Sequence, residues 1–144
     1  MNVKPDRTLG WLLPALIAYC AASLLHFAHN AVFLHSYPNM PAWLSPTGVW
    51  TAWLGLTGVG AIGYLLLRAG YGWCGLSLIA VYSLLGLDSL SHYGLAPFSA
   101  HSFTMNLTIL LDAFTALLVL TAVAMIARRR SLKPGFLAPW RLGG

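Results

Sequence analysis

Five side chains that could bind a metal ion or move a proton fall inside otherwise apolar stretches of this sequence. They are His26, His29, Asp88, His92 and Asp112. Neutral imidazole nitrogens and carboxylate oxygens are ligands for Zn, Fe, Mn and Cu. The spacings His-x-x-His and Asp-x-x-x-His each allow two side chains to share one side of a helix. These residues therefore predict a transition-metal site, provided that the three segments meet in space.

Four further polar residues lie beside these five and are expected to support or gate the same site. They are Asn30, Ser91, Tyr93 and His101. Ionisable groups inside a membrane are costly unless they are paired, so they usually face the interior of a bundle and mark functional positions. The polar residues are therefore interpreted as one constellation, and no catalytic role is assigned to any of them.

The elements that must position these residues are four apolar stretches, each long enough to cross a bilayer. Apolar residues make up 58% of the chain and charged residues only 8%, whereas a soluble domain carries roughly a quarter charged residues. A spanning helix needs about 20 mostly apolar residues. The composition predicts a single-domain, all-α integral membrane protein, an antiparallel up-down four-helix bundle. Its spans are expected at residues 9–34, 48–69, 72–93 and 103–127.

The basic residues predict the orientation of this bundle. All eight Lys and Arg residues lie before the first span, in the turn at 68–71 where the second span ends, or after the fourth span, and the other two loops have none. By the positive-inside rule, both termini, including the tail at 128–144, are expected in the cytoplasm of a bacterial cell, with the protein in the inner membrane. The net charge of +5 is attributed to contacts with anionic membrane lipid rather than nucleic acid.

Depth and helical angle both favour convergence of the polar residues. His26, His29, Asp88 and Asp112 are expected about 8–14 Å below the periplasmic ends of their helices, with His92 about one turn nearer the surface. Helical periodicity places each group on one stripe of its helix. The stripes are 19, 23, 26, 29, 30 and 33 on the first helix, 88, 91 and 92 on the third, and 101, 105, 108, 112 and 115 on the fourth.

Three interpretations of this constellation remain open. The first is a metal-binding protein that, if it is an enzyme, activates water or dioxygen near a lipophilic substrate entering from the bilayer. The second is a polar network that fixes helix register in a non-catalytic subunit of a larger membrane complex. The third is a b-type haem held between His26 or His29 and His92.

Other features concern packing. Small residues at Gly55, Gly58, Gly60 and Gly63, facing a third helix that begins at Gly72, predict close approach of the second and third helices. Cys20 and Cys74 are expected at different depths, so no disulfide is predicted. The loop sequence Tyr37-Pro38-Asn39-x-Pro41-x-Trp43 is distinctive but suggests no particular chemistry.

Overall fold

A computed structural model describes residues 7–131. The described chain is all-helical, and four of its helical segments are long and apolar enough to cross a membrane. This confirms the predicted all-α fold with four long apolar helices, which is compatible with a multi-pass membrane protein. The candidate spans are Gly10–Val32, Pro46–Arg68, Gly72–Leu95 and Phe103–Ser131. Lys4, Lys133, Arg141 and most of the predicted tail lie outside the described residues.

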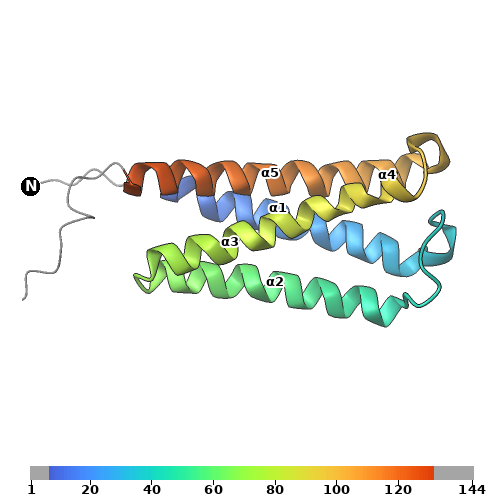
Figure 1. Cartoon of the computed structure of the whole chain (residues 1–144), viewed down its shortest axis with the longest axis horizontal. Coiled ribbons are helices and arrows are strands. Elements are labelled where there is room, and N and C mark those ends of the chain that lie inside the picture. The colour runs from blue at the N-terminus through green and yellow to red at the C-terminus, as the bar shows by residue number, and fades with distance from the viewer. Residues whose placement is uncertain (1–6, 132–144) are drawn as a thin grey trace, which may run out of the picture.

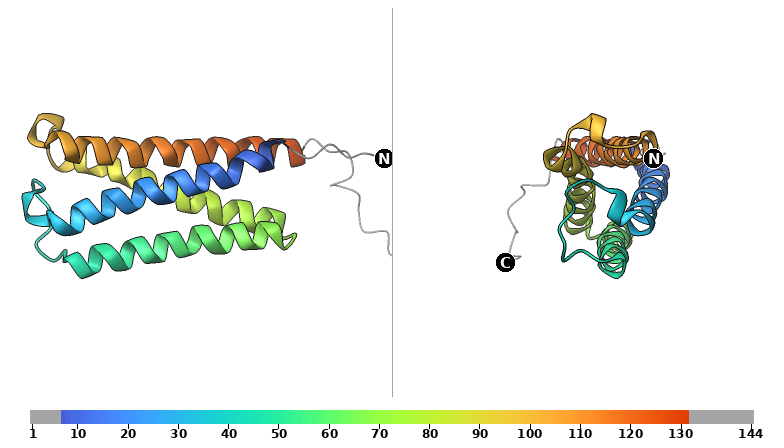
Figure 2. Two further views of the ribbon diagram at one scale, coloured as in Figure 1. Left: turned by 180° about the vertical axis from the view of Figure 1, so that it is seen from behind. Right: turned by 90° about the vertical axis from the view of Figure 1, so that its right-hand side faces the viewer.

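The helices are arranged around a square when the bundle is viewed from its end (Figure 2). Helix α1 packs against α2 and α5, and α3 also packs against α2 and α5. The start of α1 and the end of α5 lie at the same end of the bundle as the α2–α3 turn, and the two longer loops lie at the other (Figure 1). The helices and short 3-10 segments, in chain order, are α1 (Arg7–Val32), η1 (Leu34–Ser36), α2 (Pro46–Arg68), α3 (Gly72–Gly86), η2 (Leu87–Ser91), α4 (His92–Leu95), η3 (Phe98–Ala100) and α5 (Phe103–Ser131).

Local sequence explains where α2 begins and ends. The Ser45 hydroxyl accepts a hydrogen bond from the Gly48 backbone N–H, and Pro46 follows at the first helical position. This is a favourable start, because a serine satisfies an otherwise free N–H and proline needs no N–H there. Gly70, with φ of 96°, makes the turn into α3, a conformation that glycine adopts without a steric penalty.

The helix boundaries differ from the expected ones in two informative places. Helix α5 continues to Ser131, so Arg128, Arg129 and Arg130 form its last turn instead of beginning a tail. Three cations at a helix C-terminus are favourable because they face the negative end of the helix dipole. The third span changes to a 3-10 helix after Gly86 instead of continuing as one α-helix.

The half of the bundle that contains the α2–α3 turn holds the main apolar core. Leu12 and Leu16 of α1 pack there with Ile79 of α3 and Val119 and Val123 of α5. Helices α2 and α3 approach closely, since a Cβ atom added to Gly75 would lie 2.5 Å from the Leu67 backbone nitrogen. The close approach predicted from the glycines therefore holds for this half of the molecule.

Candidate functional site

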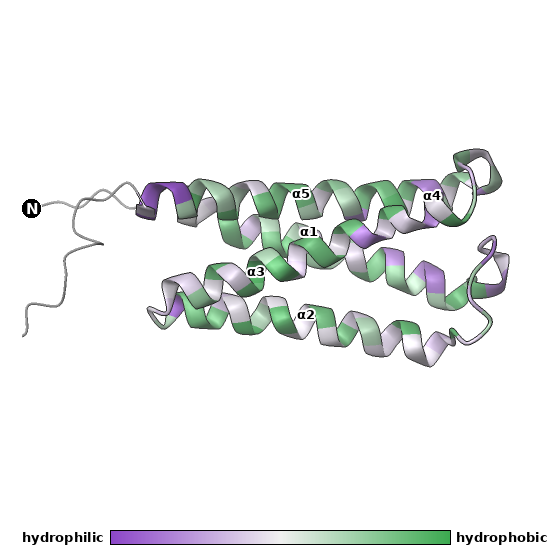
Figure 3. Ribbon diagram, in the orientation of Figure 1, coloured by the Kyte–Doolittle hydropathy of each residue, from purple (hydrophilic) through white to green (hydrophobic). Residues whose placement is uncertain are grey.

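The buried polar residues gather in the other half of the bundle. Figure 3 shows hydrophilic patches on α1 and on the segment from η2 to α4, far from the basic turn at the end of α5. Most polar members of the predicted constellation are buried here. They are His26, Asn30, His92, His101 and Asp112.

On α1 the structure confirms part of the predicted stripe. Tyr19, Ser23, His26 and Asn30 are all buried, as helical spacing requires of one face. His29 is only half-buried, and Phe33 is exposed. His29 lies about 100° around the helix from Asn30, which turns its ring away from the bundle axis. Its Nδ1 shares a 2.8 Å hydrogen bond with the hydroxyl of Tyr37 instead.

On the third span the structure places Asp88 and His92 at the same cavity, but not together on one buried face. His92 is buried, whereas Asp88 and Ser91 are exposed. The reason is η2, because a 3-10 helix has three residues per turn and brings residues i and i+3 onto one face. Ser89 therefore shares the buried face with His92, and Asp88 turns outward. The Ser89 hydroxyl donates to the Gly86 carbonyl at 2.9 Å.

On α5 the predicted stripe is confirmed. His101, Met105, Thr108, Asp112 and Thr115 are all buried. The Thr108 and Thr115 hydroxyls donate to backbone carbonyls of their own helix. Asp112 is 1% exposed, and its carboxyl group has no hydrogen-bond partner among the described residues.

Aromatic rings from three segments meet around His92. The ring centroid of His92 lies 5.4 Å from that of His26, 5.0 Å from that of Tyr37 and 6.2 Å from that of His101. Tyr93 completes the cluster with its ring 5.5 Å from that of His101. The fold therefore brings His26, His92 and His101 together, while His29 joins them only through Tyr37.

The hydrogen bond between Asn30 and His26 uses the Nε2 atom of His26, so Nδ1 is the imidazole nitrogen without a partner. The Asn30 Nδ2 atom lies 3.0 Å from the His26 Nε2 atom. An amide nitrogen can only donate, so in this arrangement Nε2 accepts and Nδ1 carries the proton. A 180° rotation of the amide would instead place its oxygen beside a protonated Nε2 and leave Nδ1 with a free lone pair.

Several buried polar atoms in this region have no hydrogen-bond partner among the described residues. Buried polar groups are normally satisfied, so each exception calls for an explanation. Solvent does not reach these atoms as the side chains stand, and a ligand would contact them only after side-chain rotation. Those in the constellation are His101 Nε2 and, on four neighbouring residues, His26 Nδ1, Asn30 Oδ1, His92 Nδ1, and Oδ1 and Oδ2 of Asp112.

All four of these residues line one cavity of about 320 Å³. Leu56 of α2 and Leu85 of α3 also line it. Helices α2 and α3 separate from each other with distance from the turn that joins them (Figure 1). Met40, Pro41 and Leu44 of the first long loop also line it. Asp88 and Ser91 belong to the lining too, but their exposure places them at its edge. The cavity is thus largely apolar with a few polar groups.

The arrangement does not by itself form a metal cage. Within residues 7–131, no three His, Cys, Asp or Glu side chains are grouped so that they could hold a metal ion. The His26 and His92 rings are in direct edge-to-face contact, with centroids 5.4 Å apart. A porphyrin placed between them would require the two helices to move apart.

Tyr37 and Ser89 are members of the site that the sequence did not suggest. Tyr37 is 3% exposed, and burial raises the pKa of its phenol above the ordinary value. It therefore stays protonated at neutral pH. The one feature of the sequence that pointed to Tyr37 was the distinctive loop sequence Tyr37-Pro38-Asn39. Asn39, with φ of 57°, donates from its side-chain amide to the Leu95 carbonyl at 2.8 Å, which ties this loop to the end of α4.

Tyr93 and His101 stabilise the second long loop, between α4 and α5, at the same end of the bundle. The Tyr93 hydroxyl donates to the side-chain oxygen of Asn106 at 3.0 Å, and the Asn106 amide donates to the carbonyls of Phe98 and His101. The His101 Nδ1 atom lies 3.1 Å from the Pro97 carbonyl oxygen. These contacts hold the His101 ring beside His92.

The chain matches no protein-family model, no curated protein and no solved structure.

Proposed function

We propose that this protein binds a lipophilic molecule that carries a polar group, in the cavity formed by α1, α2, α3, η2, α4 and α5. The observation that carries the proposal is the set of unpartnered polar atoms on His26, Asn30, His92 and Asp112 around one largely apolar cavity. Small-molecule sites typically have volumes of about 300–1,000 Å³, apolar walls and a small number of polar groups that orient the ligand. The cavity fits this description at the small end of the range.

The polar groups around the cavity determine which hydrogen-bond donors and acceptors the ligand must carry. With the amide as placed, His26 Nδ1–H is a donor and Asn30 Oδ1 is an acceptor. The Asp112 carboxyl group can accept a hydrogen bond, and it can also donate one when protonated. A hydroxyl group on the ligand would satisfy such a set, because it can accept from His26 and donate to Asn30 or Asp112 once these side chains have rotated toward it. The apolar part of the ligand would lie between Leu56 of α2 and Leu85 of α3, so that it can enter from the bilayer.

A transition-metal ion is a second candidate for the same site, favoured by one specific observation. His26 and His92 each have an unpartnered Nδ1 atom, and their ring centroids are 5.4 Å apart. Two imidazoles bound to one tetrahedral ion at about 2.0–2.1 Å would have centroids about 5 Å apart. The rotated Asn30 amide would then accept from Nε2–H, as groups beside metal-bound histidines do. Asp112 would have to rotate to supply a third ligand.

Both candidates are tested on one preparation of protein purified from its native membrane. We expect mass spectrometry of an organic extract to find one lipophilic compound in wild type and in His35→Ala, because His35 is exposed and lies outside the cavity. The His92→Ala variant should retain about tenfold less, the equivalent of one lost hydrogen bond in a dry site. Elemental analysis of the same three samples tests the metal candidate.

The outcomes separate the interpretations. Equal compound content in His92→Ala and wild type would contradict the lipophilic-ligand proposal. A stoichiometric metal that is lost only in His92→Ala would replace it with the metal site, and an absorption spectrum with a haem band would indicate haem. If none of these is found and a partner protein co-purifies in fixed ratio, the cavity belongs to a subunit with a structural polar network.

We also propose that the bundle crosses a bacterial inner membrane in antiparallel up-down fashion, with both termini in the cytoplasm. The support is the charge distribution, because no Lys or Arg occurs in the two loops at the end of the bundle that holds the cavity. The cavity then lies toward the periplasmic side.

Orientation is tested by labelling single cysteines in a variant with Cys20→Ala and Cys74→Ala. Ser99 and Ala69 are both exposed and lie at opposite ends of the bundle. A membrane-impermeant maleimide should label Ser99→Cys in cells with a permeabilised outer membrane, and Ala69→Cys only after lysis. The reverse pattern would contradict the proposed orientation.

A further inference from the structure

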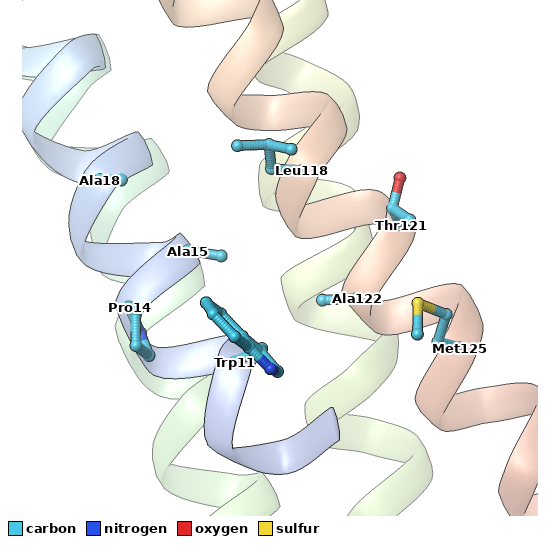
Figure 4. Close-up of a pocket in the computed structure, with 8 residues that line it drawn as sticks. All are labelled: Trp11, Pro14, Ala15, Ala18, Leu118, Thr121, Ala122 and Met125. Atoms are coloured by element: carbon cyan, nitrogen blue, oxygen red, sulfur yellow. The ribbon is translucent and has the colours of Figure 1, made fainter. Parts of the chain in front are cut away.

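A second cavity, separate from the proposed site, lies on the outside of the bundle between α1 and α5. Its volume is about 420 Å³. Trp11 and Ala18 belong to its α1 wall, and Leu118 and Met125 belong to its α5 wall. Figure 4 shows these side chains facing one another across a shallow groove, with Ala15 and Ala122 between them. The groove is open because small side chains occupy its centre.

The groove leads directly to the basic end of α5. Leu118, Ala122 and Met125 follow one another at helical spacing, and the same stripe continues one turn later at Arg128 and Arg129. Both arginines are exposed. The rise of a helix puts them about 5 Å beyond the groove along its axis. Trp11, 72% exposed, lies at this end of the groove, the level at which tryptophan favours a membrane interface.

We propose that this groove binds one anionic phospholipid, with an acyl chain between α1 and α5 and the headgroup phosphate at Arg128 and Arg129. Charge complementarity decides the occupant, because an apolar groove that ends in cations suits an apolar chain that ends in an anion. Basic pockets between membrane helices bind anionic headgroups in this way. A transmembrane helix of a partner would not use the arginines, which lie beyond the apolar part of the groove.

Native mass spectrometry of the purified full chain tests this site, with phosphatidylglycerol and phosphatidylcholine as probes. We expect wild type to retain one phosphatidylglycerol and to lose phosphatidylcholine. Ala18→Leu should reduce retention about tenfold, because leucine fills the groove. Ala21→Leu is the matched control, since Ala21 is also exposed on α1 but does not line the groove, and it should leave retention unchanged.

A second pair of variants tests the headgroup contact. Arg128→Gln should reduce phosphatidylglycerol retention about fivefold, the effect expected for one cation near a membrane surface. Arg68→Gln removes one exposed cation at the end of α2 and should have no effect. Equal retention of both lipids, or equal retention by Ala18→Leu and wild type, would overturn the proposal. So would a dimer that Ala18→Leu disrupts, because it would show that a second copy covers the groove.

Discussion

Replacing Asp112 with leucine is expected to stabilise the ligand-free protein by about 2 kcal/mol while abolishing binding in the cavity. The Asp112 carboxyl group is buried without a hydrogen-bond partner among the described residues. Such a group costs about 1–3 kcal/mol of desolvation, and a carboxylate at depth in a bilayer costs a similar amount. Leucine removes this cost, and the neighbouring cavity of about 320 Å³ has room for the larger side chain.

The measurement is unfolding in mixed micelles with increasing dodecyl sulfate, followed by circular dichroism. Thr115→Val is the matched control, because the Thr115 hydroxyl already donates to the Leu111 and Asp112 carbonyls. Removal of the Thr115 hydroxyl should change the free energy of unfolding by less than about 1 kcal/mol and should not raise this free energy substantially. If Asp112→Leu instead destabilised the protein by more than about 1 kcal/mol, Asp112 would belong to a structural network and the binding interpretation would lose its main support.

The second large effect is expected at Gly75, in the half of the bundle that holds the apolar core. A Cβ atom there would lie 2.5 Å from the Leu67 nitrogen and 2.7 Å from the Gly63 carbonyl oxygen. Both atoms belong to the backbone, so α2 and α3 would have to separate. Gly75→Ala should therefore cost about 3 kcal/mol, the upper end for overpacking.

Gly55→Ala is the comparison for this prediction. No atom lies within 4 Å of a Cβ added at Gly55, which is in the middle of α2. Alanine has the higher helix propensity, so this variant should be unchanged or slightly more stable. The same micelle unfolding experiment measures both variants. Equal stability of the two would show that the contact between α2 and α3 is less close than the structure indicates.

Much of the architecture follows from composition and periodicity. Long apolar stretches predict long apolar helices, as the structure has them. Helical spacing correctly placed Tyr19, Ser23, His26 and Asn30 on one buried face. The stripe on α5 was equally predictable, because that helix is regular through Asp112. Regular helices convert sequence spacing directly into direction.

The part of the constellation that lies on the third span could not be predicted in the same way. Its geometry depends on η2, and no proline or charge pattern marks the change from α-helix to 3-10 helix there. Once the turn tightens, Asp88 leaves the buried face and Ser89 replaces it. Tyr37 was missed for a different reason. It reaches the site through tertiary contacts between a loop and the helices α1, α4 and α5, which sequence spacing does not report.

The most direct test of the proposed site is an experimental density map of the protein purified from its native membrane without added ligand. We expect density for one elongated molecule in the cavity, with its polar end within hydrogen-bond distance of His26, His92 or Asp112. Its apolar part should lie between Leu56 and Leu85. A map in which Asp112 instead bonds directly to His26 or His92, with the cavity closed, would contradict a binding function for this site.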